Sequence, residues 1–184
     1  MAALCAERGL VDALVPSAGF VNKNGFFMLR GTVPRSAMVR ALARSSWLKA
    51  GALALLGRWL VPELPFSPGF LLEGARRVLR AVAAAGCEGA GPAVLAIGGF
   101  IDAGAVEAAL QEGFAGVQMA RALIREPDLV RRWEAEFAAA AAGGGGSGAG
   151  GARASPCSHC NACVVAALEG AKASPRCVER EPQW

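Results

Sequence analysis

The stretch AVLAIGGFIDAGAVEAALQEGFAGVQMARAL, residues 93–123, decides the fold class of this chain. Two short apolar runs, AVLAI at 93–97 and AGVQM at 115–119, have the length and composition of buried strands. Between them, Asp102 can cap a helix that Gly113 ends. Because a strand, a helix and a second strand in this order form a βαβ unit, the stretch predicts two parallel strands joined by a right-handed crossover.

The same alternation extends along the chain in both directions. VDALV at 11–15 reads as a further strand, and residues 70–86 place apolar side chains at the spacing of an amphipathic helix. Pro127 can open another helix over residues 128–137. The sequence therefore predicts an α/β protein with about three parallel βα units.

Two segments interrupt this pattern and divide the chain. Residues 21–68 contain four prolines and are expected to be helical between about 36 and 60. Because this segment is too long for an ordinary connection, we interpret it as a functional loop or subdomain. Residues 138–155 are rich in Ala, Gly and Ser, which is typical of a flexible linker. We therefore expect an α/β part over 1–137, this linker, and a cysteine-rich tail over 156–184.

The charge pattern favours a small-molecule partner. The net charge of +4 comes from scattered arginines and not from a basic run, so we expect no nucleic-acid binding. The chain has a single histidine, His159, and no tyrosine, which leaves few candidates for acid–base chemistry. The catalytic residues stay unassigned at this stage.

The N-terminus and the most hydrophobic stretch bear on the compartment. The first residues lack the basic start and apolar run of a secretory signal. Residues 48–66 are apolar but are broken by Arg58 and Pro62, and an uninterrupted run of roughly twenty residues is needed to span a bilayer. We expect a helix packed in the interior or at an interface, no membrane association, and an intracellular protein, in the cytoplasm or an organelle.

The ends of the predicted strands carry the residues most suited to a ligand. Ligands bind at the carboxyl ends of strands in parallel α/β folds. There, Gly98 and Gly99 would expose backbone amides in front of a helix N-terminus, and Arg121 could add a charged contact to the same anion. Each feature alone is more often a tight turn or a surface arginine. Together they predict a phosphate site of the kind found after strands seven and eight of a (β/α)8 barrel.

Four cysteines near the end of the chain form a second candidate site. Cys157, Cys160, Cys163 and Cys177 have the spacing C-x2-C-x2-C-x13-C. Thiolates at this spacing can bind a [4Fe–4S] cluster. Zinc accepts the same four ligands, or His159 in place of one of them. The remaining alternative is a reduced tail whose cysteines bind nothing.

Several of these stretches resemble one family. LAIGGFIDAGAVEAALQEGFAGVQMARALIREPDLVRRW is similar to the last two βα units of the NADH:flavin oxidoreductases, the old yellow enzyme family. VDALVPSAGFVNKNGFFMLRGTVP resembles the sixth strand and the loop after it in one subgroup. LLGRWLVPELPFSPGFLLEGARRV and CSHCNACVVAALEGAKASPRCV continue the likeness in family order.

The resemblance implies a flavin enzyme. Such a protein is an FMN-dependent (β/α)8 barrel that takes hydride from NAD(P)H and passes it to a small-molecule substrate, an activated alkene or another oxidant. By this resemblance the FMN phosphate would be held by Gly98, Gly99, Ala120 and Arg121. The edge of the flavin would lie near Ser17 and Gly19.

The resemblance also implies an incomplete barrel and an iron–sulfur tail. Three strands are recognisable where the family has eight, so we expect the C-terminal portion of a barrel. Association with a chain that supplies the missing half-barrel is one way to complete it. Members related to the dienoyl-CoA reductases hold a [4Fe–4S] cluster on a cysteine segment after strand eight, usually with a second gap one residue longer than here. The alternative function is a non-catalytic metal- or iron–sulfur-binding fragment that acts through protein–protein contacts.

Overall fold

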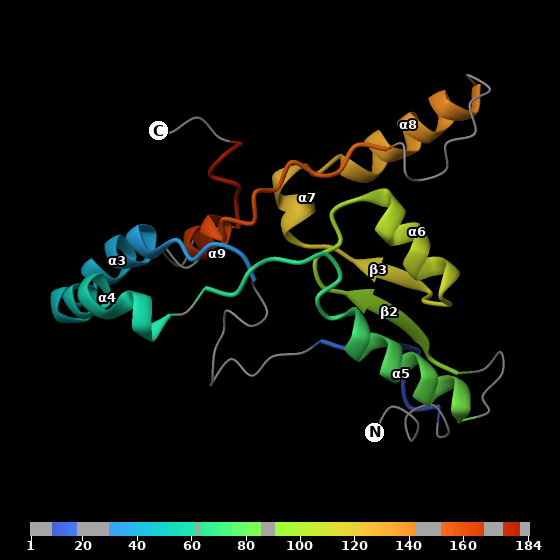
Figure 1. Ribbon diagram of the computed structural model, residues 1–184, viewed down its shortest axis with the longest axis horizontal. Helices are drawn as coiled ribbons and strands as arrows, with labels where there is room; N and C mark the ends of the chain where they lie inside the picture. The colour runs from blue at the N-terminus through green and yellow to red at the C-terminus, as the bar shows by residue number, and fades with distance from the viewer. Residues whose placement is uncertain are drawn as a thin grey trace. The chain divides into compact units, whose positions relative to one another are not determined.

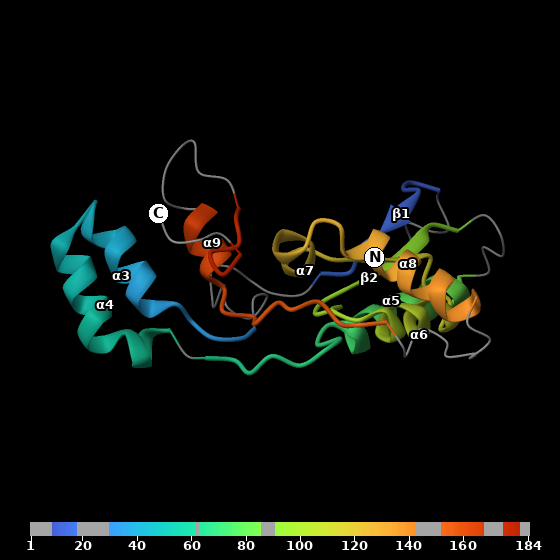
Figure 2. The same cartoon turned by 90° about the horizontal axis from the view of Figure 1, so that it is seen from above.

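The computed structural model describes residues 9–17, 30–61, 63–85, 91–142, 152–167 and 175–180 (Figures 1 and 2). The chain divides into two compact units, each of which combines segments that are distant in sequence. The first unit draws on Met1–Ala18, Ser67–Ala120 and Asp128–Ser155, and the second on Gly19–Phe66, Arg121–Pro127 and Pro156–Trp184. The division predicted from the sequence follows chain order, whereas each of these units gathers non-consecutive segments.

A parallel sheet forms the centre of the first unit. Its strands are β1 (Ala13–Leu14), β2 (Ala93–Ile97) and β3 (Gly116–Gln118), hydrogen-bonded in that order. Both neighbouring pairs run parallel, as the βαβ pattern of the sequence predicts. The prediction of an α/β protein with three parallel strands is therefore confirmed.

Two helices pack on one face of this sheet, α5 (Leu72–Ala84) and α6 (Ala103–Gln111) (Figure 1). The side chains of β2 alternate between the two faces, and Val94 and Ala96 are buried under these helices. The buried core of this face consists of Ala75, Val94, Ala96, Phe100, Ala109 and Phe114. The amphipathic spacing of residues 70–86 is thus explained by the packing of α5.

The opposite face of β2 is apolar as well but is less covered. Ala93, Leu95 and Ile97 are all half-buried in the described part of the chain. Sheets made of parallel strands are normally covered on both faces, which is why their strands are apolar throughout. The apolar composition of β2 is therefore typical of a strand that is buried on both faces.

The predicted helix boundaries in this unit are confirmed by cap geometry. The Asp102 carboxylate accepts a hydrogen bond of 2.7 Å from the backbone N–H of Ala105 at the start of α6. Gly113, with a φ of +98°, ends that helix in a conformation that favours glycine. Helix α8 (Leu129–Ala142) begins after Pro127 and includes the first alanines of the predicted linker.

The second unit is mainly helical. Helices α3 (Arg35–Ala43) and α4 (Trp47–Leu60) pack against each other within the stretch predicted to be helical, and the Ser46 side chain caps α4. Two short helices were not predicted, α7 (Arg121–Arg125) and α9 (Ala162–Ala167).

Helix α4 contains the apolar stretch expected to form a helix packed in the interior or at an interface. It buries Ala50, Leu53 and Gly57, while Leu55 and Trp59 are each 85% exposed. Among the described residues, none of the helices is both long and apolar enough to cross a membrane.

Candidate functional site

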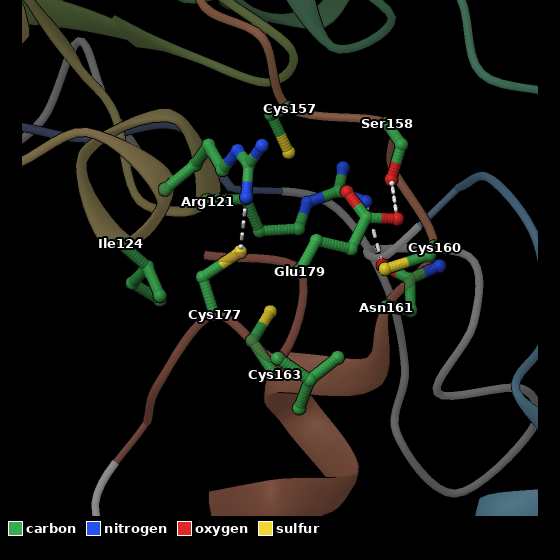
Figure 3. A pocket seen from close by; sticks show the side chains of 11 residues that line it. Arg121, Ile124, Cys157, Ser158, Cys160, Asn161, Cys163, Cys177 and Glu179 are labelled. Atoms are coloured by element: carbon green, nitrogen blue, oxygen red, sulfur yellow. Dashed lines mark hydrogen bonds between the residues drawn. The ribbon is translucent and has the colours of Figure 1, made fainter. Parts of the chain in front are cut away.

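The four cysteines of the predicted metal motif line one pocket, which lies within the second unit (Figure 3). Cys157 and Cys160 belong to the loop before α9, Cys163 lies in the first turn of α9, and Cys177 comes from a later segment. All four carry free thiols. Residues that are up to twenty positions apart in sequence thus share a single pocket, as the motif predicts.

The cysteine loop is tightly bent. His159 and Asn161 have φ values of +58° and +56°, a left-handed conformation that is uncommon outside glycine and is best tolerated by Asn, Asp and His. Two such residues on either side of Cys160 turn the loop sharply, so that the cysteines before and after the bend line the same pocket.

A distant segment fastens this loop through its backbone. The Thr32 N–H donates to the His159 carbonyl oxygen at 3.1 Å. Next to it, Gly31 has a φ of +118°, and a Cβ at this position would lie 2.3 Å from the same oxygen. Glycine is therefore required here both for its conformation and for the close approach of the two backbones.

Asn161 fixes the loop through its side chain. It is only 2% exposed, and its Oδ1 accepts a hydrogen bond of 2.6 Å from Arg121 Nη1. Its Nδ2 donates to the carbonyl oxygen of Thr32 at 3.0 Å. Since a buried amide is costly unless its donors and acceptors are paired, these bonds tie the loop to α7 and to residues 30–32 at once.

Arg121 is one of two arginines that line the pocket, together with Arg125. Its Nη1 donates to the Arg30 carbonyl oxygen at 2.8 Å as well as to Asn161, and its guanidinium carbon lies 5.8 Å from the centre of the Phe66 ring. Burial lowers the pKa of Arg121, whereas the sulfurs of Cys157, Cys163 and Cys160 raise it. Arginine stays protonated in proteins, so a positive charge is held beside the thiols.

Burial dominates the ionisation of two of the thiols. It raises the pKa of Cys157 and of Cys163, while the charge of Arg121 acts in the opposite direction on both. Free thiols with a raised pKa are protonated at neutral pH. Binding of a metal centre would therefore displace protons from them.

His159 lies away from the thiols. Its ring stacks on Phe66 with a centroid distance of 3.4 Å and an interplanar angle of 13°. Burial, with a smaller contribution from the charge of Arg121, lowers the pKa of His159 to about 4, so the imidazole is neutral at pH 7. Its Nε2 is buried without a hydrogen-bond partner among the described residues, and the ring does not line the pocket. The zinc ligand set that includes His159 has no support in this arrangement.

The donor set fits a thiolate-bound centre by its chemistry. Within the described residues, no three His, Cys, Asp or Glu side chains are arranged so that they could hold a metal ion. Four sulfurs around one zinc ion, each at about 2.3 Å, would have to lie much closer to one another than ligands that bind separate corners of a cubane. Four thiols that line one pocket are the type of ligand that both an iron–sulfur cluster and a zinc ion take.

The second cysteine segment is held by its own contacts. Arg125 Nη1 lies 3.6 Å from Cys177 Sγ, and this contact raises the pKa of Arg125. Ser158 donates to the Glu179 carboxylate at 2.7 Å, which joins the loop to the segment around Cys177. The fourth cysteine is thus brought to the pocket by polar contacts on both sides of it.

The residues predicted to hold a phosphate lie partly in the other unit. Gly98 and Gly99 follow β2 with φ values of +111° and +82°, and a Cβ on Gly98 would lie 2.8 Å from Leu71 Cβ, so packing alone explains the glycine at 98. The Asp102 carboxylate accepts a hydrogen bond from the Ala105 N–H at the N-terminus of α6, so this amide is not available to a ligand. Convergence of the diglycine and Ala120 with Arg121 stays a prediction, because Arg121 belongs to the second unit.

The residues predicted near a flavin edge have different outcomes. Ser17 is exposed in the first unit. Gly19 lies outside the described residues, as do Cys5 and Cys87.

Comparison with known proteins gives one informative relative. The chain is 31% identical over 181 residues to the 4,4'-dithiodibutanoate disulfide reductase of Rhodococcus erythropolis. The match covers 98% of this chain and 38% of that protein, so the chain spans well under half the length of the relative. No family model matches the chain. No solved structure matches it either.

Sequence reasoning missed the residues that fasten the pocket. Asn161 stands between the second and third cysteines of the motif, which was a usable signal, because Asn tolerates a left-handed bend. Residues 30–32 carried no such signal, since their contacts with the loop span about 130 positions and use mainly backbone atoms.

Proposed function

We propose that this chain is the FMN-phosphate-binding part of an NAD(P)H-dependent flavin oxidoreductase that carries an iron–sulfur cluster on its four cysteines. The single observation that carries the proposal is the four-cysteine pocket, in a chain that is similar along 98% of its length to a disulfide reductase. The similarity supports a redox function, and the pocket supplies the ligands that such a function would use.

A barrel is the architecture that best accounts for the first unit. Its parallel strands are covered by α5 and α6 on one face, and the other face of β2 carries half-buried apolar side chains. In a (β/α)8 barrel the helices form the outer ring and that inner face is filled by side chains of the other strands. We therefore propose that β1, β2 and β3 are three of the strands of such a barrel, with strands supplied by further chain length or by a partner chain.

The FMN phosphate would lie at the carboxyl ends of β2 and β3. Gly98, Gly99, Ala120 and the backbone of Arg121 are the groups that would hold it there. Ser17, and Gly19 by resemblance, would lie toward the flavin edge. When bound, FMN supplies hydride and electron transfer, while these residues fix its phosphate and orientation.

The substrate class follows from the relative. Its name specifies reduction of an organic disulfide that carries two carboxylates, 4,4'-dithiodibutanoate. Such a step breaks the S–S bond, takes a hydride from NAD(P)H and a proton from solvent, and leaves two thiols, so that electrons and atoms balance. We propose a small organic disulfide or a comparable oxidant as the substrate here.

The proposal is tested by flavin binding and cluster assembly in the same preparation. The full chain is reconstituted anaerobically with iron and sulfide, then titrated with FMN and with riboflavin, which lacks the phosphate. We expect iron and sulfide to be retained in equal amounts, and FMN to bind more tightly than riboflavin. Equal affinity for the two flavins would refute the phosphate site, and zinc uptake without iron–sulfur absorbance would favour the non-catalytic metal-binding alternative.

A further inference from the structure

The charged group that faces the four thiols has a specific position. Figure 3 shows the Arg121 side chain among the cysteines that line the pocket. The guanidinium is held by two hydrogen bonds from one nitrogen, to the Arg30 carbonyl oxygen at 2.8 Å and to Asn161 Oδ1 at 2.6 Å. Both acceptors are uncharged, so neither of them neutralises the arginine.

The pocket that Arg121 lines holds two kinds of group that can be anionic: the Glu179 carboxylate, which accepts a hydrogen bond from Ser158, and the four thiols, which lose their protons when they bind a metal centre. Among the described residues Arg121 forms no salt bridge with a carboxylate, and the groups that raise its pKa are Cys157, Cys163 and Cys160. The Phe66 ring lies beside it, with its centre 5.8 Å from the guanidinium carbon, and Arg121 is half-buried. A charge that is partly removed from water acts more strongly on its neighbours than a solvated one.

From this arrangement we infer that Arg121 is a positioning residue for the cysteine site, a fixed counter-charge that stabilises the reduced form of a cluster bound there. The inference rests on the proposed function, because it requires the cluster. It assigns the guanidinium to the thiols, whereas the sequence had suggested that this group binds the FMN phosphate.

The direction of the effect follows from charge. A [4Fe–4S] centre with four thiolates carries net negative charge, and one-electron reduction adds to it. A nearby fixed cation therefore favours the reduced form and raises the reduction potential. A half-buried arginine at this position would thereby make the cluster easier to reduce by a flavin or another one-electron donor.

Arg125 provides a comparison within the same pocket. It also contacts a cysteine, at 3.6 Å from Cys177 Sγ, and this contact raises its pKa more than burial lowers it, whereas burial is the largest effect on the pKa of Arg121. A cation that remains in contact with water is screened, so its charge should influence the centre less than that of Arg121.

The experiment measures the midpoint potential of the reconstituted full chain. The cluster is reduced with dithionite in the presence of redox mediators, and the reduced form is followed by electron paramagnetic resonance. Four variants are compared with the unaltered chain: Arg121→Met, Arg121→Lys, Arg125→Met and Arg40→Met. Arg40, in α3, makes the same change in net charge without lining the pocket.

The expected result is a graded series. Arg121→Met shifts the midpoint to more negative potential, Arg125→Met shifts it less, and Arg121→Lys and Arg40→Met stay near the unaltered chain. Equal midpoints for Arg121→Met and Arg40→Met would overturn the inference. If the Arg121→Met protein takes up no cluster, the Arg121→Lys protein decides the question. An unchanged midpoint potential of Arg121→Lys supports the role of the charge. Loss of the cluster from Arg121→Lys as well would show that Arg121 has a purely structural role, and would overturn the inference.

A flavin measurement on the same variants separates the inference from the proposed function. If Arg121→Met abolishes the preference for FMN over riboflavin and leaves the midpoint unchanged, Arg121 binds the phosphate and the counter-charge assignment is wrong. If the unaltered chain itself assembles no cluster, this result refutes the proposed iron–sulfur function, and the inference about Arg121, which requires the cluster, is refuted as well.

Discussion

The Oδ1 atom of Asn161 accepts a hydrogen bond of 2.6 Å from Nη1 of Arg121, forty residues earlier in the chain. This contact joins the cysteine loop to the segment that follows β3. Because the same asparagine also donates to the Thr32 carbonyl oxygen, three parts of the chain meet at one buried amide. The position of the thiols therefore depends on a residue that is not one of the four cysteines.

Replacement of Asn161 by Ala should destabilise the second unit. It removes the Asn161 bonds to Arg121 Nη1 and to the Thr32 carbonyl oxygen, so that Arg121 keeps only its bond to the Arg30 carbonyl oxygen among the described residues, and this costs roughly 1–3 kcal/mol of the free energy of unfolding. Urea denaturation followed by circular dichroism measures the change. Ser158→Ala is the control, because Ser158 bonds Glu179 in an exposed position and its loss should have little effect. Equal midpoints for the two variants would contradict this role of Asn161.

Two glycines of the second unit should respond to Ala in opposite directions. At Gly31 a Cβ would lie 2.3 Å from the His159 carbonyl oxygen and the φ is +118°, so Gly31→Ala should lower the free energy of unfolding by more than about 1 kcal/mol. At Gly51, inside α4, a Cβ meets no atom within 4 Å, and Gly51→Ala should raise it by about 0.5–1 kcal/mol. Thermal unfolding of both variants gives the comparison, and a stabilised Gly31→Ala protein would show that the two backbones do not approach in this way.

Each of the four pocket cysteines should be needed for iron retention. Substitution of Cys157, Cys160, Cys163 or Cys177 by Ser removes one thiolate, and the remaining three hold a cluster poorly. Iron and acid-labile sulfide per chain after gel filtration are the measured quantities. Cys87→Ser is the matched control, because Cys87 stands outside the motif and should leave both values unchanged. Retention of full iron content by the Cys177→Ser protein would remove this cysteine from the ligand set.

The ion pair between Arg76 and Glu112 should make the first unit sensitive to acid. Two nitrogens of Arg76 donate to the two Glu112 oxygens at 2.6 Å, and these bonds lower the pKa of Glu112 from its ordinary value of 4.5. A carboxylate with a lowered pKa contributes stability above pH 4.5 and loses it as the pH falls through the folded-state value.

This pH dependence is measured against the Glu112→Gln variant. The unaltered chain should have the higher melting temperature at pH 7, and the difference should vanish toward pH 2 and shrink in high salt, because both groups are partly exposed. A difference that persists in strong acid would assign the effect to something other than this charge pair.

Much of the first unit could be predicted from local sequence signals. Strand β2 is an uninterrupted apolar run, Asp102 is a good capping residue, and Gly113 marks the end of α6. These signals act within a few residues, so one sequence suffices to read them. The half-buried second face of β2 could also be predicted, because polar and apolar residues do not alternate along this strand.

The second unit was harder to predict because its decisive contacts are long-range. The spacing of the cysteines pointed to a shared site, and they do share a pocket. Nothing local to Arg30 or Thr32 indicates that their carbonyl oxygens receive Asn161. Helix α7 was missed for a related reason: five residues are too few for a periodic apolar pattern to be recognised.

The contact of Gly31 and Thr32 with the His159 backbone has a consequence for anyone who wishes to transplant the cysteines into another scaffold. The four cysteines all stand after residue 156, yet the backbone that contacts their loop lies about 130 positions earlier in the sequence. Transfer of the C-terminal stretch alone would carry the four cysteines without the backbone segment that contacts their loop. The two stretches should be exchanged between homologues as a matched pair.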